Sequence, residues 1–229
     1  MIKSLFKLGY IGRGCLSLLL VGTAPAWAAS LQAELVDLND KPLANAVLSL
    51  RGPLGAETGP ATAVMDQVQL QFAPSVLAVK TGTRVSFPNS DNIRHHVYSF
   101  SPSKRFELRL YQGTPSEPVL FDQPGVVVLG CNIHDAMVGY LYVTDDPWFA
   151  VSDAQGRLQL EQLPVGRYAA TLWHPDTPDR QAQPAGELQV DEKGLSQRFQ
   201  LAVQATSPQA PAAPTAFGDA FRKATRASE

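Results

Sequence analysis

Cysteine is scarce in this sequence, with only Cys15 and Cys131 among 229 residues. Cys15 lies in residues 1–28, where basic residues precede a short apolar run and a final A-W-A motif, the pattern of a removable signal peptide. We therefore expect cleavage of this segment, which leaves Cys131 as the one thiol of the mature chain. A lone thiol excludes an intramolecular disulfide in the disulfide-forming compartment that export reaches. It is then buried and inert, paired with another chain, or bound to a metal.

Long apolar runs are also missing. A membrane-spanning helix needs about 20 consecutive apolar residues, and no stretch of this sequence provides them. The N-terminal segment also has no twin arginine, so we expect the chain to cross the membrane unfolded and to acquire any metal afterwards. The sequence predicts a periplasmic protein without a membrane span after signal cleavage.

An excess of positive charge is absent as well. The chain has 19 basic and 21 acidic residues, and the first 28 residues contain three of the basic ones and no acidic one. The mature chain would then carry 16 − 21, or a net charge of about −5 with neutral histidines. Nucleic acid is therefore not an expected partner. Paired carboxylates and a phosphate-binding loop are also missing, so we do not expect an enzyme.

Helical periodicity is nearly absent, and short stretches that alternate between apolar and polar residues take its place. In residues 67–72, Gln67, Gln69 and Gln71 alternate with Val68, Leu70 and Phe72, which predicts a half-solvated strand with the glutamines outside. Residues 46–51 alternate in the same way and predict a strand with one buried face. Short strands between turns indicate an all-β fold of sandwich or barrel type.

The strands divide into two groups. Residues 60–145 form the first, and residues 148–203 form the second, whose D-A-Q-G-R-L-Q-L and L-P-V-G-R-Y stretches resemble carboxypeptidase-regulatory-like and immunoglobulin-like sandwiches. The strand, turn and strand that usually begin such domains are missing there and occur instead at residues 31–52. We expect residues 31–52 to belong to this second sandwich, with the first group inserted into it. Two domains in series remain the alternative, because sequential neighbours usually pack together. Residues 204–229 begin with a Pro/Ala-rich stretch that predicts a disordered tail.

The heptad C-N-I-H-D-A-M places a thiol at Cys131, an imidazole at His134 and a thioether at Met137. Thiolate and thioether suit reduced copper, and imidazole suits both of its oxidation states. A fourth ligand has to come from another strand, and the adjacent His95 and His96 lie in an apolar stretch upstream. His174, beside Trp173 in the second group of strands, has no such companion and is expected to be structural.

Residues 66–144 resemble a cupredoxin, the blue-copper fold of plastocyanin and amicyanin. The resemblance rests on a V-x-F-x-N-x-D lead-in, a His-x-V motif, a P-G before an apolar strand, and a terminal Cys-x-x-His-x-x-Met with amicyanin-like spacing. The whole chain resembles proteins described as methylamine utilisation or plastocyanin-like proteins. The resemblance implies a Greek-key β-sandwich and one type 1 copper ion. It assigns His95, Cys131 and His134 to a trigonal plane and Met137 to a weak axial position.

The histidine doublet leaves one choice open. Strand alternation places His95 and Val97 on one face and His96 on the other, and His95 is the residue that matches the motif. His96 is then either a hydrogen-bonding partner that braces the ligand loop or a surface residue.

Other chemistries fit this residue set less well. Structural zinc prefers four strong nitrogen or sulfur ligands, a binuclear copper centre needs a second cysteine, and a cysteine hydrolase places its nucleophile and base on separate elements. The sequence therefore predicts a protein that carries single electrons between redox partners, in transient contact with a c-type cytochrome or a periplasmic dehydrogenase. In the family the second histidine emerges through an apolar patch, for which Ile133 and Ala136 are the candidates. A copper carrier or sequestration protein, and an adhesion or scaffold module with a structural copper site, are the alternatives.

Overall fold

The fold is described by a computed structural model that covers residues 28–53, 61–115 and 117–203. The predicted tail and, apart from Ala28, the predicted signal peptide lie outside these residues. Strands dominate the described chain, and its one helical element there is the 3₁₀ turn η1, Pro178–Arg180. The prediction of an all-β fold is confirmed. None of the described helical structure has the length and apolar character needed to cross a bilayer.

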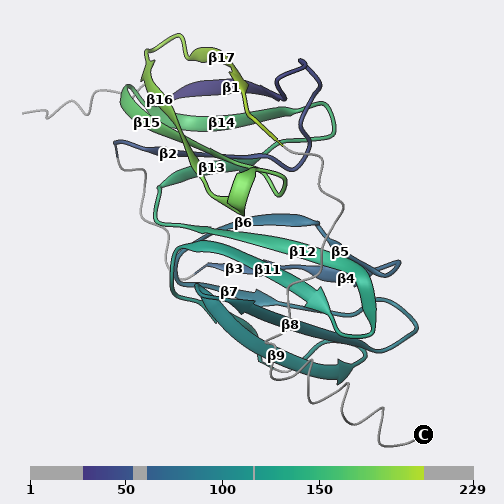
Figure 1. Cartoon of the computed structure of the whole chain (residues 1–229). Coiled ribbons are helices and arrows are strands. Elements are labelled where there is room, and N and C mark those ends of the chain that lie inside the picture. The colour runs from purple at the N-terminus through teal and green to yellow at the C-terminus, as the bar shows by residue number, and fades with distance from the viewer. Residues whose placement is uncertain (1–27, 54–60, 116, 204–229) are drawn as a thin grey trace, which may run out of the picture.

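The large sandwich consists of β3 to β12 and forms the lower part of the molecule in Figure 1. Its larger sheet has the strand order β6-β12-β11-β8-β9, and its smaller sheet has the order β10-β7-β3, with a separate β4-β5 hairpin. The strands are β3 Thr62–Val64, β4 Asp66–Val68, β5 Gln71–Ala73, β6 Val76–Lys80, β7 Thr83–Ser86, β8 His95–Ser101, β9 Lys104–Tyr111, β10 Val119–Phe121, β11 Gly125–Cys131 and β12 His134–Thr144. Phe87, Phe106 and Phe121 pack edge to face or at a tilt in its core, together with buried Val and Leu side chains.

The small sandwich combines strands from both sides of the large one in the sequence. Its three-stranded sheet has the order β14-β1-β17, and its four-stranded sheet has the order β13-β2-β15-β16. The strands are β1 Ala28–Val36, β2 Val47–Arg51, β13 Trp148–Val151, β14 Arg157–Pro164, β15 Gly166–Trp173, β16 Gln183–Val190 and β17 Leu195–Gln200. Strand β1 pairs antiparallel with β14 and parallel with β17, while β2 lies between β13 and β15. The chain therefore leaves the small sandwich after β2 and re-enters it at β13.

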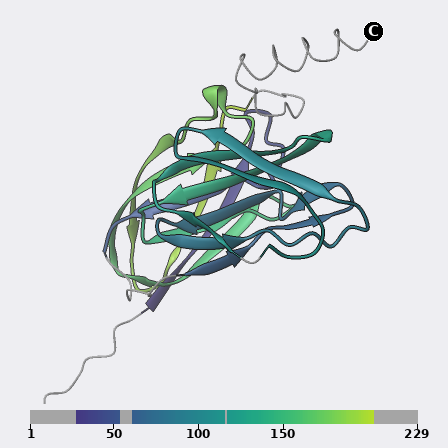
Figure 2. The same ribbon diagram turned by 90° about the horizontal axis from the view of Figure 1, so that it is seen from below.

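The two sandwiches share a buried apolar interface. Trp173 is fully buried and contacts Tyr140 and Tyr142 of β12 at ring-centroid distances of 5.8 and 5.7 Å. Val47 and Val76 complete this cluster from β2 and β6. Figure 2 shows the two groups of strands from below, where they overlap in projection. Because β12 contributes to this interface and to the core of the large sandwich, it joins the two.

Two predictions from alternation are wrong, for different reasons. Residues 67–72 form a hairpin with a turn at Gln69 and Leu70, not one strand, and Gln67 is buried while Leu70 is 45% exposed. The side-chain nitrogen of Gln67 donates to the carbonyl oxygens of Phe87 and Pro88, and these hydrogen bonds allow the amide nitrogen to be buried. In β2, Val47 and Ser49 are also buried, because the large sandwich covers the second face of that strand.

Candidate metal centre

Cys131 and His134 face each other across a tight hairpin. Strand β11 ends at Cys131, two exposed residues form the turn, and β12 begins at His134, which pairs with Cys131. The preceding pair is Gly130 with Val138, so residues 135–137 form a bulge in β12 that has no counterpart in β11. A bulge of this kind re-aims side chains at the end of a ladder. The sequence predicted a loop after Cys131, whereas the structure has a bulged hairpin.

His95 comes from the neighbouring strand. Val97 of β8 pairs with Cys131 of β11, and this register places His95 beside the hairpin. Burial alternates along β8, so that His95 and Val97 point into the large sandwich and His96 points away from it. The backbone nitrogen of Asn132 in the ligand turn donates to the carbonyl oxygen of His96 at 3.3 Å, which ties the turn to β8.

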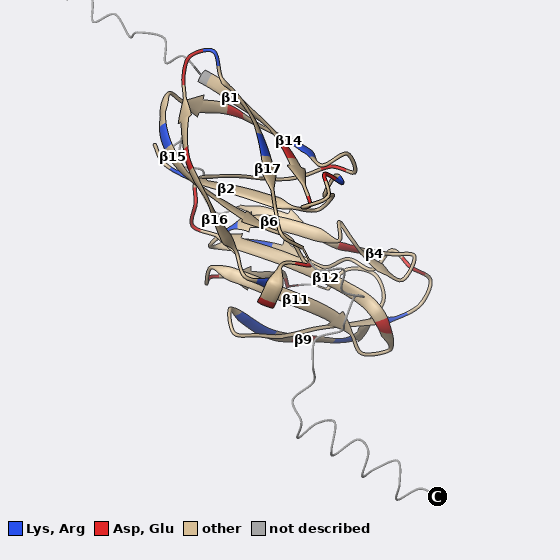
Figure 3. Ribbon diagram, turned by 45° about the horizontal axis from the view of Figure 1, so that its top comes forward, with Lys and Arg blue, Asp and Glu red and all other residues tan. Residues whose placement is uncertain are grey.

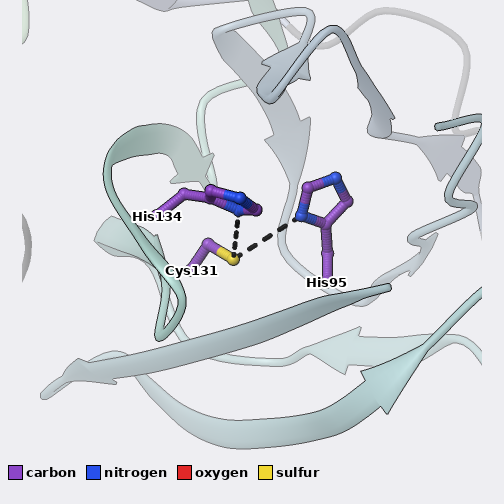
Figure 4. Close-up of side chains that lie close together, drawn as sticks. All are labelled: His95, Cys131 and His134. Atoms are coloured by element: carbon purple, nitrogen blue, oxygen red, sulfur yellow. Dashed lines mark hydrogen bonds between the residues drawn. The ribbon is translucent and has the colours of Figure 1, made fainter. Parts of the chain in front are cut away.

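The three side chains converge on one point, as Figure 4 shows. The Sγ atom of Cys131 lies 3.7 Å from Nδ1 of His95 and 3.7 Å from Nδ1 of His134. The ligand atoms of the three residues all lie within 4.8 Å of one another. Cys131 and His95 are buried, whereas His134 is partly exposed. In the described part of the chain, this is the one cluster of His, Cys, Asp or Glu side chains with the geometry of a metal site.

Asp91 holds His95 in this orientation, a role that the sequence reasoning missed. Its Oδ2 atom lies 2.8 Å from Nε2 of His95, which leaves Nδ1 directed at Cys131. The carboxylate also accepts hydrogen bonds from the backbone nitrogens of Gln69 at 2.6 Å and Leu70 at 2.9 Å. The bond from Leu70 is the largest cause that lowers the pKa of Asp91 below its usual value of 3.8, and the bond to His95 adds to it. The i, i+4 spacing of Asp91 and His95, at the end of the V-x-F-x-N-x-D lead-in, was the available signal.

Asn89 and Tyr111 brace the segment that leads to His95. The side-chain nitrogen of Asn89 donates to the carbonyl oxygens of Ile93 at 2.8 Å and Tyr111 at 2.9 Å. The hydroxyl of Tyr111 donates to the carbonyl oxygen of Phe87 at 2.7 Å and accepts a short hydrogen bond from Gln67. Burial raises the pKa of Tyr111 to about 12, so this hydroxyl stays protonated and able to donate near neutral pH.

The other two histidines lie apart from the cluster. The Nε2 atom of His96 lies 3.0 Å from Oε1 of Glu107 on β9, a contact that does not involve the ligand hairpin. Nε2 of His174 lies 3.1 Å from the carbonyl oxygen of Ala44, and its Nδ1 accepts from the backbone nitrogen of Asp176. Both ring nitrogens of His174 are thus engaged within the small sandwich. Burial lowers the pKa of His174, which favours its neutral form.

Met137 is 1% exposed and belongs to the same buried cluster as Cys131. It lies at the end of the bulge, three residues after His134. Its position is compatible with the predicted axial role, which stays a prediction.

The donor set fits one copper ion. Ligands about 2.1 Å from an ion in a trigonal plane lie about 3.6 Å apart, close to the sulfur–nitrogen separations seen here. A cysteine with two histidines is a soft and borderline ligand set of the kind that type 1 copper uses. The second ring nitrogen of His95 meets a carboxylate, an arrangement typical of metal-binding histidines.

Comparisons with known proteins find solved structures that are similar to part of the chain. No protein-family profile matches the chain, and no curated protein does so. A purple cupredoxin from Nitrosopumilus maritimus is 21% identical over 37% of this chain and 99% of its own, with a TM-score of 0.32. A reduced amicyanin variant is 20% identical over 42% of this chain and 99% of its own, with a TM-score of 0.32. A Cu-containing nitrite reductase from Thermus scotoductus is 25% identical over 49% of this chain, with a TM-score of 0.34; the match spans 28% of that enzyme. The solved structures similar to this chain are thus mainly cupredoxins.

Proposed function

We propose that this chain is an exported one-electron carrier that binds a single type 1 copper ion through His95, Cys131 and His134, with Met137 as the axial ligand. The observation that carries the proposal is the convergence of one thiol and two imidazole nitrogens in a largely buried position. When bound, copper supplies a one-electron couple at a thiolate-containing site. We expect no catalytic reaction by the chain itself.

The surrounding residues hold the ligands in place before an ion binds. Asp91 fixes the ring of His95, and the pairing of Cys131 with Val97 and His134 fixes the sulfur between two strands. A ligand set that is already in position requires little rearrangement when the charge of the site changes. Such a site suits repeated electron transfer better than a bond-making reaction.

Exposed apolar side chains gather at the ligand end of the large sandwich. Ile133 in the ligand turn is 48% exposed, and Ile93, two residues before His95, is 43% exposed. Leu110 precedes Tyr111, the residue that pairs with His95, and is 50% exposed. Together with the partly exposed His134, these residues would offer an apolar contact for a c-type cytochrome or a periplasmic dehydrogenase, bound weakly and briefly.

Replacement of Cys131 by Ser tests the copper assignment. The copper-loaded wild-type protein should show an intense visible band from sulfur-to-copper charge transfer and the electron paramagnetic signature of type 1 copper. Cys131→Ser should lose both while its far-ultraviolet circular dichroism is unchanged. A correctly folded, copper-loaded wild type without an intense visible band would refute the type 1 assignment.

Copper carriage is the second candidate, and the partial exposure of His134 favours it, because an acceptor protein could approach the site from that side. Incubation of the copper-loaded chain with a copper-binding acceptor separates the two functions. Rapid reversible reduction with copper retained supports electron transfer, whereas complete passage of copper to the acceptor supports carriage.

A further inference from the structure

A groove of about 400 Å³ lies between the two sandwiches and reaches the ligand hairpin. Among the residues that line it are Ala136, Val138 and Tyr140 of β12 on one side and Asn45, His174 and Asp176 of the small sandwich on the other. Ala136 is exposed and lies inside the bulge between His134 and Met137. A molecule that enters the groove from this end therefore contacts the small sandwich and the metal-ligand hairpin together.

The wall formed by the small sandwich has a fixed local shape. His174 uses one ring nitrogen on Ala44 and the other on the backbone of Asp176. Thr177 is buried and donates its hydroxyl hydrogen to the carbonyl oxygen of His174 at 2.8 Å. These contacts hold residues 174–177 as a closed turn at the edge of the groove.

The two walls are also fixed relative to each other. Apart from the aromatic interface around Trp173, the buried carboxylate of Asp146 accepts hydrogen bonds from Ser49 at 2.7 Å and from Arg51 at 3.1 Å, both on β2. Asp146 lies in the connection between β12 and β13, so this contact fastens that connection to β2 of the small sandwich. The groove is therefore a permanent feature of the fold rather than a gap between loosely tethered domains.

One acidic residue, Asp176, lines the groove, and two more acidic residues are close in sequence to residues that line it. Asp135 is exposed beside Ala136, the side chain of Asp176 is 35% exposed, and Asp179 is exposed on η1. Arg180 is the nearby basic residue and interacts with the hydroxyl of Tyr140. Figure 3 shows acidic and basic residues on both sandwiches, and the mature chain carries a net negative charge of about five. A negatively charged protein with a carboxylate at the groove attracts a positively charged partner over distances of a Debye length.

We infer that the groove is part of the docking surface for a basic redox protein, with the small sandwich as one wall of a composite site. A basic side chain of the partner enters the groove near Asp176 while its redox centre approaches His134. The inference rests on the proposed function and assigns to the small sandwich a role in partner selection. A partner that touched only the apolar end of the large sandwich would not distinguish this chain from a cupredoxin without the added unit.

The test uses the copper-loaded protein and a lysine-rich ferrous cytochrome c as a basic probe, which loses one electron as copper(II) becomes copper(I). Asp176→Lys changes the charge of the groove, and Glu192→Lys is the matched control. Glu192 is exposed beyond the end of β16, near the turn that contacts Ser30, at the opposite end of the small sandwich. Reduction by ascorbate provides a measure of copper competence that does not depend on protein docking.

At about 0.01 M salt, where the Debye length is about 30 Å, we expect Asp176→Lys to slow reduction by the cytochrome about tenfold and Glu192→Lys less than about twofold. The difference should shrink strongly at about 0.15 M salt, and ascorbate should reduce all three proteins equally. Amide resonances of Asn45 and Asp176 should shift when the cytochrome is added to the reduced protein. Equal slowing by both variants, or shifts confined to the Ile133 end, would overturn the docking inference while ascorbate reduction still supported the proposed function. Failure of ascorbate to reduce the copper in the wild type would instead refute the proposed function.

Discussion

Asp91 should control how tightly the site holds copper, although it is not a ligand. Its carboxylate accepts one hydrogen bond from His95 and two from the backbone of the β4-β5 turn. Each such bond contributes about 1 kcal/mol to stability, so Asp91→Ala should lower the free energy of unfolding of the metal-free protein by about 3 kcal/mol. Loss of the partner of a metal-binding histidine typically lowers affinity about 10- to 100-fold, and we expect this range for copper.

Two measurements check these values. Denaturant unfolding of the metal-free protein gives the stability change, and competition with a chelator of known affinity gives the copper dissociation constant. Asp122→Asn is the control, because Asp122 is an exposed carboxylate of the same sandwich whose contact is with Lys104. The stability and the copper affinity of Asp91→Asn should lie between those of the wild type and Asp91→Ala, since an amide oxygen can still accept hydrogen bonds from the turn. If Asp91→Ala bound copper as tightly as the control, the idea that this carboxylate positions His95 would be wrong.

Three further predictions concern stability. Asp146→Ala should lower the free energy of unfolding by about 2 kcal/mol, because it removes the acceptor of the buried Ser49 hydroxyl and the partner of the exposed Arg51, whereas the exposed Asp145→Ala should change it little in the same denaturant titration. The pKa of His174 is lowered in the folded state, so the folded protein binds this proton less readily than the unfolded protein, in which the pKa is near 6.5. Neutral His174 therefore makes its full contribution to the free energy of unfolding above that pH, and this contribution is lost as the pH falls below it. Unfolding free energies measured from about pH 7 to about pH 5 should fall more steeply in the wild type than in His174→Gln, and equal slopes would contradict this linkage. Gln69→Gly should raise the unfolding temperature, because Gln69 has a φ of 54° that costs a non-glycine residue about 1 kcal/mol; a lower temperature would show that the turn is not strained.

The sequence predicted the strands better than it predicted which side chains are buried. Alternation in β8 placed His95 and Val97 on one face, because that strand has core on one side and a more open surface on the other. The same reasoning failed at Gln67, whose side chain is buried because it bonds to carbonyl oxygens that lie about twenty residues away in the sequence. It also failed for β2, whose second face is covered by a sandwich formed later in the chain. Local pattern cannot report burial caused by distant segments.

In the candidate site, too, the local sequence predicted some features, and others depend on distant segments. The heptad places Cys131 and His134 close together by local geometry, and the motif selected His95 from the doublet. The sequence reasoning considered His96 as a brace of the ligand loop, but the His96 side chain contacts Glu107 in the structure. The brace that the structure shows is a different one, between Asp91 and the ring of His95. A bracing role depends on side-chain direction as well as spacing, and the direction follows from the fold of the β4-β5 turn.

Strand β12 connects the candidate metal centre to the interface between the two sandwiches. Its first residues, from His134 to Met137, form one side of the candidate metal centre. Further along the strand, Tyr140 and Tyr142 pack against Trp173 of the small sandwich. A strand cannot shift at one end without disturbing its register at the other, because a slip of one residue exchanges the faces of all its side chains. The small sandwich therefore does more than supply a wall of the groove: by fixing the far half of β12 it limits the positions that the ligand half can adopt.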